Sequence, residues 1–527
     1  MTSVTLSTPS TDSSISAKLS DLKPAPSCDA ITTTSSTHPV FVVSHPFDVK
    51  TSCAVRLRSA DNVDFFVNAV IATMASPVFA KMLLPGNIEN LAREEDGTAI
   101  IHLPEWRAVV VDTILRIIYP SMRNPDIPSV SHIYAVLKAA RQFDMGLVQQ
   151  VAQSSLAQFV PSDPVRVFAV ACAFGFEKEA ADAAQAAIHC RKAFQHFRFE
   201  YLPEMQDVSA GMMSRFSFFV NKFGSVPNAF SFIYPTAGAS PALSSGYSGI
   251  KPGAELIKVA DSCTLTHAIF SRIPNDLIVY SSVNAEETFS THKFAVMVSS
   301  PVLADRLRDV SLSGLPKLVL PESVEVLRCL LRNCYRALNL DVDVVDERAG
   351  GDRTRCLVGV ALAAAKYKMA AVVKLAHGDL LSLIETLDPL EAYFVASLFG
   401  WEVEARLAAR NAVEMLPDFH YVPVMEEASA MSYTRLLQYR VSVQEAVKGV
   451  VKEYVCTNSY FTSPVWFVGI SPPEQTVPAP KDYMQNYCGV SLPVFVPTAP
   501  SESYHNLRRA LEVNVKAAAD EVVLEFD

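Results

Sequence analysis

Residues 163–187 read DPVRVFAVACAFGFEKEAADAAQAA, and residues 388–412 read DPLEAYFVASLFGWEVEARLAARNA. Aligned without a gap, the two stretches share twelve identities in twenty-five positions, where chance would give about two at ordinary residue frequencies. An Asp-Pro pair opens each stretch, and a Phe-Gly pair ends its first apolar run. The chain is therefore an internal duplication, and this repeat decides its architecture.

The Phe-Gly pairs predict helix ends. Glycine lacks a Cβ, so it adopts the left-handed conformation that follows the last turn of many helices. We therefore expect Gly175 and Gly400 to close helices. We also expect the aromatic side chains before them, Phe174 and Phe399, to pack inward.

The similarity extends in both directions from these stretches. Upstream, Ala75–Val78 matches Ser299–Val302, and Leu103–Glu105 matches Leu320–Glu322. Downstream, the matched positions are Pro203 with Pro423, Met205 with Met425, and Ser209-Ala210 with Ser429-Ala430. The repeating unit is roughly 160–180 residues long, which is the size of a domain with an extension.

Hydrophobic periodicity in the first repeat predicts a mixed α+β unit. Alternating apolar and polar side chains predict strands, here Val55–Arg58, Asp64–Val67 and Ala99–Leu103. Helical segments are predicted at Ala69–Leu84, Val109–Ile118 and Ile133–Leu147, with Ser76-Pro77 able to start a new turn. The predicted order is therefore strand, strand, helix, strand, helix, helix.

These motifs resemble those of the BTB/POZ family. Phe65–Phe79 looks like the start of such a domain, and Phe289–Lys293 carries the family's Phe-x-x-His-Lys pattern before Ser300-Pro301-Val302. The later Asp-Pro and Phe-Gly helices resemble those of the tandem BTB-domain proteins abundant in mushroom-forming fungi. The resemblance covers about residues 46–215 and 270–440. It implies two units, each a small three-stranded sheet packed on a helix cluster, and it implies binding to other proteins.

Composition along the chain completes the expected domain organisation. The Ser/Thr-rich N-terminus has too little apolar surface to offset the entropy cost of ordering, and Leu507, Leu511 and Val515 stand at helical spacing. We expect a disordered tail at 1–44, a first BTB/POZ-like domain at 45–150, its helical extension at 151–235, a linker at 236–255, a second BTB/POZ-like domain at 256–380, its helical extension at 381–450, and a Pro-rich segment with a C-terminal helix at 451–527.

Family members with a charged pocket at their dimer interface carry an Asp at the start of the first strand and a basic residue near the second. The second repeat keeps Asp276 and His292-Lys293 at these positions, whereas the first has Ala54 and Asn68-Ala69. The resemblance therefore makes Asp276, His292 and Lys293 candidate partner-binding residues. The alternative is that Asp276 and Lys293 form an ordinary surface pair, which contributes less than about 1 kcal/mol to stability.

A second resemblance concerns cullin binding, which in some BTB proteins needs a hydrophobic residue two positions before a Glu. Glu89 stands at the position of that Glu, but Asn87 occupies the hydrophobic position. Ser311 and Ser313 fill both places in the second repeat. A polar amide loses its hydration in an apolar pocket, so Glu89 is a candidate contact and cullin binding is weakly supported.

Composition excludes several function classes. The net charge of −10 argues against direct nucleic-acid binding, which needs a basic face. No apolar run approaches the twenty residues or so that span a bilayer. The ten cysteines form no CxxC pair, so we expect reduced thiols, Cys329 and Cys334 in the core, and an intracellular location, cytoplasmic or nuclear.

The sequence shows no motif for catalysis. It contains no Gly-x-Ser-x-Gly, no phosphate-binding loop and no HExxH, and we expect no catalytic residues, no cofactor and no metal. We therefore expect a non-enzymatic adaptor or scaffold that binds other proteins. The alternatives are a substrate-recruiting subunit of a cullin-type ubiquitin ligase and a transcriptional co-regulator. Because the two BTB-like domains share one chain, we also expect them to form an intramolecular pseudo-dimer, with the chain largely monomeric.

Overall fold

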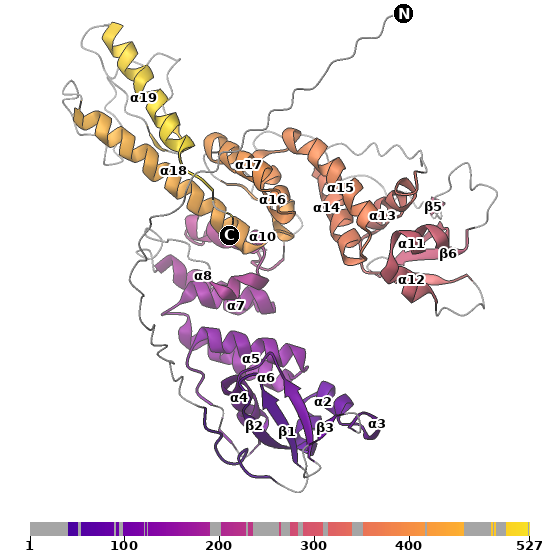
Figure 1. Cartoon of the computed structure of the whole chain (residues 1–527). Coiled ribbons are helices and arrows are strands. Elements are labelled where there is room, and N and C mark those ends of the chain that lie inside the picture. Colours follow the sequence, from indigo (N-terminus) through magenta and orange to yellow (C-terminus); the bar gives the residue numbers. More distant parts are fainter. Residues whose placement is uncertain are drawn as a thin grey trace, which may run out of the picture. The chain divides into compact units, whose positions relative to one another are not determined.

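The fold is described from a computed structural model of the chain (Figure 1). The structure describes residues 41–50, 54–88, 91–93, 98–120, 122–123, 125–189, 202–227, 230–234, 263–264, 275–282, 288–308, 315–339, 351–416, 419–457, 486–488, 490–491, 502–524 and 526. The segments expected to be a disordered tail and a linker lie almost entirely outside these residues. The first sheet forms one compact unit, and most helices form another with the second sheet.

The first repeat, residues 54–221, begins with strands and ends with helices. Its elements are β1 (Ala54–Ser59), β2 (Asp64–Asn68), α1 (Ala69–Ala75), α2 (Pro77–Met82), α3 (Pro85–Ile88), β3 (Ala92–Arg93), β4 (Ala99–Leu103), α4 (Ala108–Ile118), α5 (Val130–Gln142), α6 (Gly146–Ser155), η1 (Leu156–Phe159), α7 (Pro164–Phe174), α8 (Glu177–His189), η2 (Pro203–Asp207) and α10 (Ala210–Asn221). The three predicted strands and the helix predicted at 109–118 are present, whereas the helix predicted at 133–147 ends at Gln142, because Asp144 has φ +53°, and α6 begins at Gly146. The segment predicted as one helix at 69–84 is two, because Ser76 and Pro77 start a new one.

The second repeat, residues 277–457, follows the same order. The elements from β5 to the C-terminus are β5 (Cys263–Thr264), β6 (Leu277–Ser281), β7 (Thr288–Thr291), α11 (Lys293–Ser299), α12 (Pro301–Arg308), β8 (Lys317–Leu320), α13 (Val324–Arg336), α14 (Gly351–Lys366), α15 (Ala370–Leu383), η3 (Ile384–Thr386), α16 (Pro389–Leu398), α17 (Glu402–Met415), η4 (Pro423–Glu426), α18 (Ala430–Thr457), β9 (Asn486–Tyr487), β10 (Val490–Ser491) and α19 (Glu502–Asp520). Apart from α3 and β3, every described element of the first repeat has a counterpart here.

The two sheets share their strand pairing. In the first, β1 pairs antiparallel with β2 and parallel with β4, and in the second β6 pairs antiparallel with β7 and parallel with β8. Both sheets have four strands, not the three expected, in the orders β2-β1-β4-β3 and β5-β7-β6-β8. The extra strands β3 and β5 have two residues each, and a two-residue segment is too short to show a hydrophobic alternation.

A buried serine holds the same place in each repeat. Ser76 and Ser300 are fully buried at the starts of α2 and α12. Each hydroxyl accepts a hydrogen bond from the backbone N–H three residues on, at 3.1 Å for Phe79 and 3.0 Å for Leu303. Each also donates to a distant carbonyl, that of Phe143 or Tyr367. The Ser-Pro motif therefore both caps a helix and ties it to the end of another.

The Phe-Gly pairs close helices as predicted. Gly175 has φ +78° and Gly400 has φ +70°, the left-handed region that glycine adopts without strain. The aromatic side chains before them are only half-buried, so the expectation of inward packing was partly wrong. Phe174 packs against Tyr134 and Phe176, while Phe399 packs against His377 and Trp401. Helix periodicity places both rings at the rim of the core.

The C-terminal helix α19 packs along α18. Its Leu511 and Val515 side chains are fully buried, and Figure 1 shows the two helices side by side. Arg410 of α17 forms an ion pair at 2.5 Å with Asp520 at the end of α19. These contacts join residues 502–520 to the second repeat, although the segment before them lies mostly outside the described residues.

Replacing Ser300 with Ala should lower the free energy of unfolding of the second repeat by about 2–3 kcal/mol. The substitution removes a helix cap and leaves the buried Tyr367 carbonyl without its donor. Urea denaturation followed by circular dichroism would measure the change. The control is Ser382→Ala in α15, an exposed serine whose hydroxyl bonds only within its own helix. If both variants unfold at the same urea concentration, the buried serine does not have this role.

Candidate protein-interaction surfaces

Helices α1 and α11 expose apolar side chains at corresponding positions. Val70 and Met74 on α1 are 58% and 83% exposed, and Phe294 and Val298 on α11 are 40% and 67% exposed. Residues four apart lie on one face of a helix. Single exposed apolar residues are ordinary on protein surfaces, but the same pair recurs at the same place in both repeats, which makes these two faces candidate interaction surfaces.

Asp276 and Lys293 are brought together in the structure. Asp276 is exposed and immediately precedes β6, and its Oδ1 accepts a hydrogen bond at 2.5 Å from the backbone N–H of Lys293. That N–H belongs to the first turn of α11, where backbone donors have no partner within the helix. The described contact therefore caps a helix, rather than joining two charged side chains. Both side chains reach the surface, and their contact with a partner stays a prediction.

His292 lies in the core between β7 and α11. Its side chain is 1% exposed, and its Nδ1 lies 2.9 Å from the Tyr335 hydroxyl, which also accepts the His292 backbone N–H at 3.1 Å. Thr291 Oγ1 lies 2.8 Å from the same hydroxyl, and burial raises the pKa of Tyr335. His292 thus joins β7 to α13 in this conformation. A direct contact between His292 and a partner stays a prediction that requires this core to open.

Most of the residues that the sequence relates to cullin binding lie outside the part of the chain that the structure describes. Glu89, Ser311 and Ser313 lie outside the described residues. Asn87 is exposed, and its Nδ2 donates a hydrogen bond at 2.7 Å to the Lys81 carbonyl. Its amide is therefore engaged locally, and a cullin contact through Glu89 stays a prediction.

The helical extensions of the two repeats meet in a two-stranded backbone contact. The Ala210 N–H donates to the Ala428 carbonyl at 2.8 Å, and the Ala430 N–H donates to the Val208 carbonyl at 2.9 Å. Ser209 and Ser429 form an antiparallel bridge between them. Because positions 208–210 correspond to 428–430, each hydrogen bond is the counterpart of the other. The two repeats are therefore joined with local two-fold symmetry.

Helices on either side of this bridge repeat the symmetry. Helix α10 packs against α18, η2 contacts α18, and η4 contacts α10. The apolar side chains here are fully or almost fully buried: Met205, Met213, Phe216, Met425, Tyr433 and Leu436. Contact between the repeats was expected from the BTB-like domains. In the described residues it comes from the extensions, while the apolar faces of α1 and α11 remain exposed.

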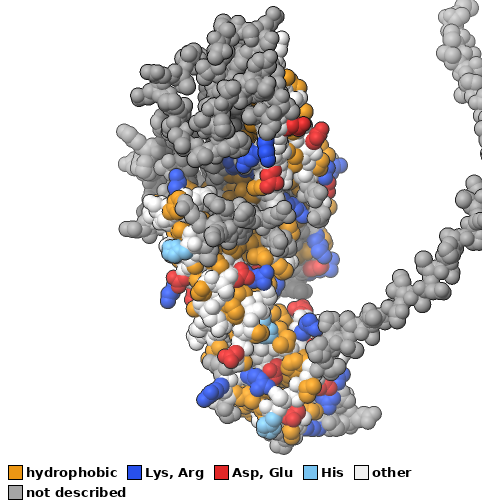
Figure 2. Space-filling model, turned by 90° about the vertical axis from the view of Figure 1, so that its left-hand side faces the viewer, with side chains coloured by type: hydrophobic (Ala, Val, Ile, Leu, Met, Phe, Trp, Pro, Cys, Tyr) orange, Lys and Arg blue, Asp and Glu red, His pale blue; other side chains and the backbone are white. Residues whose placement is uncertain are grey.

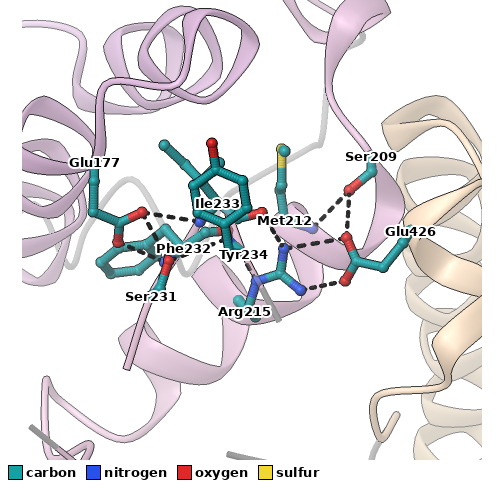
Figure 3. A network of polar contacts seen from close by, with 9 residues as sticks. All are labelled: Glu177, Ser209, Met212, Arg215, Ser231, Phe232, Ile233, Tyr234 and Glu426. Atoms are coloured by element: carbon teal, nitrogen blue, oxygen red, sulfur yellow. Dashed lines mark hydrogen bonds and ion pairs between the residues drawn. The ribbon is translucent and has the colours of Figure 1, made fainter. Parts of the chain in front are cut away.

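One side of this symmetric contact carries a partly buried ion pair. The Arg215 guanidinium contacts the Glu426 carboxylate, with Nη2 donating to Oε2 at 3.3 Å, and also donates to the carbonyls of Phe232 and Ile233 at 2.9 and 3.2 Å. Ser209 Oγ donates to the same carboxylate at 3.3 Å. Figure 3 shows Arg215 between residues 231–234 and Glu426. The Arg215 and Glu426 side chains are only 10% and 22% exposed.

A second carboxylate holds the segment that Arg215 binds. Glu177, at the start of α8, accepts hydrogen bonds from the backbone N–H groups of Phe232 and Ile233 at 2.7 and 3.1 Å, and from the Ser231 hydroxyl at 2.9 Å. Figure 3 shows these contacts on the opposite side of the segment from Arg215. Residues 231–233 are thus fixed between Glu177 and Arg215, which orients the guanidinium toward Glu426.

Among the described contacts, this ion pair has no counterpart across the bridge. In the alignment that pairs Ser209 with Ser429, Arg215 corresponds to Arg435, but Glu426 corresponds to Gln206. An amide carries no charge to pair with Arg435, so the two repeats hold each other asymmetrically. Sequence reasoning missed this pair because Arg215 and Glu426 are 211 positions apart. The available signal was the Gln206/Glu426 difference at the end of the repeat.

Comparison with known protein families finds a match for one part of the chain. The family model of the BTB/POZ domain matches residues 44–159. This stretch is similar to a BTB/POZ domain. The BTB/POZ domain is a non-enzymatic protein–protein interaction module. The match runs from the segment before β1 to η1 and includes the exposed face of α1. No curated protein matches the chain.

The distribution of charge and of possible metal ligands indicates no further candidate site within the described residues. Figure 2 shows one face on which basic and acidic side chains are interspersed, with apolar side chains between them. None of the described helices is long and apolar enough to cross a membrane. In the same part of the chain, no three His, Cys, Asp or Glu side chains are grouped as metal ligands.

Replacing Gly211 with Ala should have opposite effects with and without Glu426. A methyl at Gly211 would lie 2.5 Å from Glu426 Cδ and 2.8 Å from Oε2, so it should displace the carboxylate and reduce stability by about 1–3 kcal/mol. In a Glu426→Ala background the clash is gone, and the same substitution should stabilise by about 0.5–1 kcal/mol because alanine restricts the unfolded chain. Urea denaturation of the four proteins measures both effects.

The matched control is Gly449→Ala in α18, where no atom lies within 4 Å of an added methyl. It should stabilise by about 0.5–1 kcal/mol in either background. A Gly211→Ala variant as stable as Gly449→Ala in the presence of Glu426 would show that the carboxylate does not occupy this position.

Proposed function

We propose that this chain is a non-enzymatic adaptor or scaffold with two BTB/POZ-like units, held together by their helical extensions. The observation that carries the proposal is the BTB/POZ match at residues 44–159, followed by a second region with the same order of elements. An interaction module that occurs twice on one chain supports the joining of partner proteins.

Three features of residues 277–383 support a second BTB/POZ-like unit. The strands β6, β7 and β8 pair as β1, β2 and β4 do. Ser300 repeats both hydrogen bonds of Ser76. Helix α11 repeats the exposed apolar pair of α1. Core, capping and surface features thus coincide, which a chance similarity of fold class would not produce.

The exposed faces of α1 and α11 are the proposed docking surfaces. Their side chains differ in kind, because Val70 and Met74 present flexible aliphatic groups while Phe294 adds an aromatic ring. Aromatic and methionine side chains are enriched at the centres of protein interfaces. Since the two faces have diverged, we expect them to bind different partners.

The two alternative functions would need additional features. A substrate-recruiting subunit of a cullin-type ligase would need a productive contact at Glu89, where Asn87 presents an amide. A transcriptional co-regulator would depend on a DNA-binding partner, since the sequence offers no zinc-finger pattern. No described contact favours either alternative over the general adaptor.

Affinity capture of the full-length chain with mass spectrometry tests the proposal. Met74→Glu should remove one subset of co-purifying proteins and Val298→Glu another, because a charge on an apolar interface is costly to bury. The control is Val513→Glu on α19, which adds the same charge at a position 64% exposed. It should leave both subsets unchanged.

The outcomes separate the functions. If both variants retain every co-purifying protein, partners do not dock through these helices. Recovery of a cullin that is lost in Glu89→Lys would favour the ligase alternative. The chain has a calculated mass of 57.6 kDa, which is the value that light scattering should give for a monomer. If the wild-type chain has twice this mass and Met74→Glu or Val298→Glu has the monomer mass, the molecule bound at that helix face is a second copy of the chain.

A further inference from the structure

Two cysteines of the second repeat lie side by side on neighbouring helices. Cys329 is on α13 and Cys356 is on α14, and their sulfur atoms are 3.0 Å apart. Both side chains are half-buried. A disulfide bond is about 2.05 Å long, so the two sulfurs need to approach by only about 1 Å to bond.

A glycine explains why the sulfurs are so close. A Cβ at Gly359 of α14 would lie 2.6 Å from Cγ2 of Val326 on α13, so the helices can pack this closely only because glycine has no side chain. Val326 is three residues before Cys329, and Gly359 is three residues after Cys356. In an antiparallel helix pair, these two contacts lie one turn apart. The close packing at Gly359 therefore holds the thiols together.

The second end of the helix pair is fixed as well. Glu322, just before α13, accepts hydrogen bonds from Lys366 at 2.8 Å and from the Tyr367 hydroxyl at 2.9 Å. Along α14, this contact lies about two turns from the Gly359 contact, on the side away from the cysteines. The helices are therefore aligned along their length, and the thiols do not meet by the movement of a loose segment.

Three further cysteines whose side chains the structure describes differ from this pair. Cys172, Cys334 and Cys488 are buried. Burial raises the pKa of the Cys334 thiol to about 11 and raises that of Cys172 further. Because the thiolate is the reactive form, these buried thiols are poor nucleophiles at neutral pH. Cys334 also lies one turn beyond Cys329 on the same helix, which makes it a useful internal comparison.

We propose that Cys329 and Cys356 form a reversible intramolecular disulfide that staples α13 to α14 when the protein meets a peroxide. One thiol attacks a peroxide oxygen, becoming a sulfenic acid, while the second oxygen leaves as water. The other thiol then attacks the sulfenic sulfur, forming the S–S bond and releasing a second water. Two thiols thus lose two electrons and two protons, and a dithiol reductant reverses the step.

The staple would act on the helix pair next to the contact between the repeats. Helix α14 contacts η4, whose last residue is Glu426. Burial and the neighbouring Glu426 carboxylate raise the pKa of Tyr421, and the charges of Arg215 and of Arg355, the residue before Cys356, partly offset that rise. Fixing α14 against α13 therefore fixes a surface on which the Glu426 segment rests.

Tryptic peptide mapping of the full-length protein tests the proposal. The reduced, folded protein is treated with hydrogen peroxide and then unfolded in urea, so that every remaining thiol, buried or not, is alkylated. It is then digested without reductant. Cleavage after arginine and lysine places Cys329 in peptide 329–332, Cys356 in 356–366 and Cys334 in 333–336. We expect peptide 329–332 linked to 356–366, two hydrogens lighter than the sum of the two, and its loss after dithiothreitol.

Variants and a second measurement make the test decisive. Cys329→Ala and Cys356→Ala should each abolish the linked peptide, while peptide 333–336 stays alkylatable in every sample. Circular dichroism of each variant checks that it is folded. The proposal is overturned if both cysteines remain alkylatable after peroxide, or if the linked species runs as a dimer on a non-reducing gel. Sulfinic acid at either cysteine in place of the linked peptide would also overturn it.

Discussion

The contact between the two helical extensions is the constraint on which the relation of the repeats depends. Backbone hydrogen bonds between 208–210 and 428–430 are made in an apolar interior, where an unpaired amide or carbonyl is costly. They fix one register of α10 on α18. The surrounding methionine and aromatic side chains contribute the area that is removed from water, but they do not select that register. The directional bonds select it.

The Arg215–Glu426 ion pair adds specificity to this contact more than net stability. Removing two charges from water costs several kcal/mol, and close pairing with further hydrogen bonds offsets that cost. Arg215 meets this condition because two carbonyls and a carboxylate surround it. Glu177 fixes the segment that supplies the carbonyls. The Arg215–Glu426 pair thus adds an asymmetric contact to a symmetric framework.

Duplication has kept the interior and changed the surface. The buried serines, the strand pairing and the left-handed glycines recur because each meets a backbone requirement that is the same in both copies. The exposed pair on α1 and α11 meets no such requirement, and its side chains have diverged. The cysteine pair of α13 and α14 belongs to the second repeat alone, since the aligned region of the first repeat has none. The two repeats therefore share a framework but present different chemistry.

The sequence by itself determined the duplication, the order of strands and helices, and the helix ends at Gly175 and Gly400. These features are local, or they recur at a fixed spacing, so residue type and periodicity reveal them. Tertiary structure alone decided where the repeats touch and which polar groups are buried. No pattern in the sequence marks Arg215 as buried, and the sequence makes His292 a candidate binding residue, whereas the structure buries both side chains. Likewise, Cys329 looked like a core residue, and only the close packing at Gly359 shows that its neighbour is Cys356. Such contacts depend on distances between residues far apart in the chain, which no local pattern encodes.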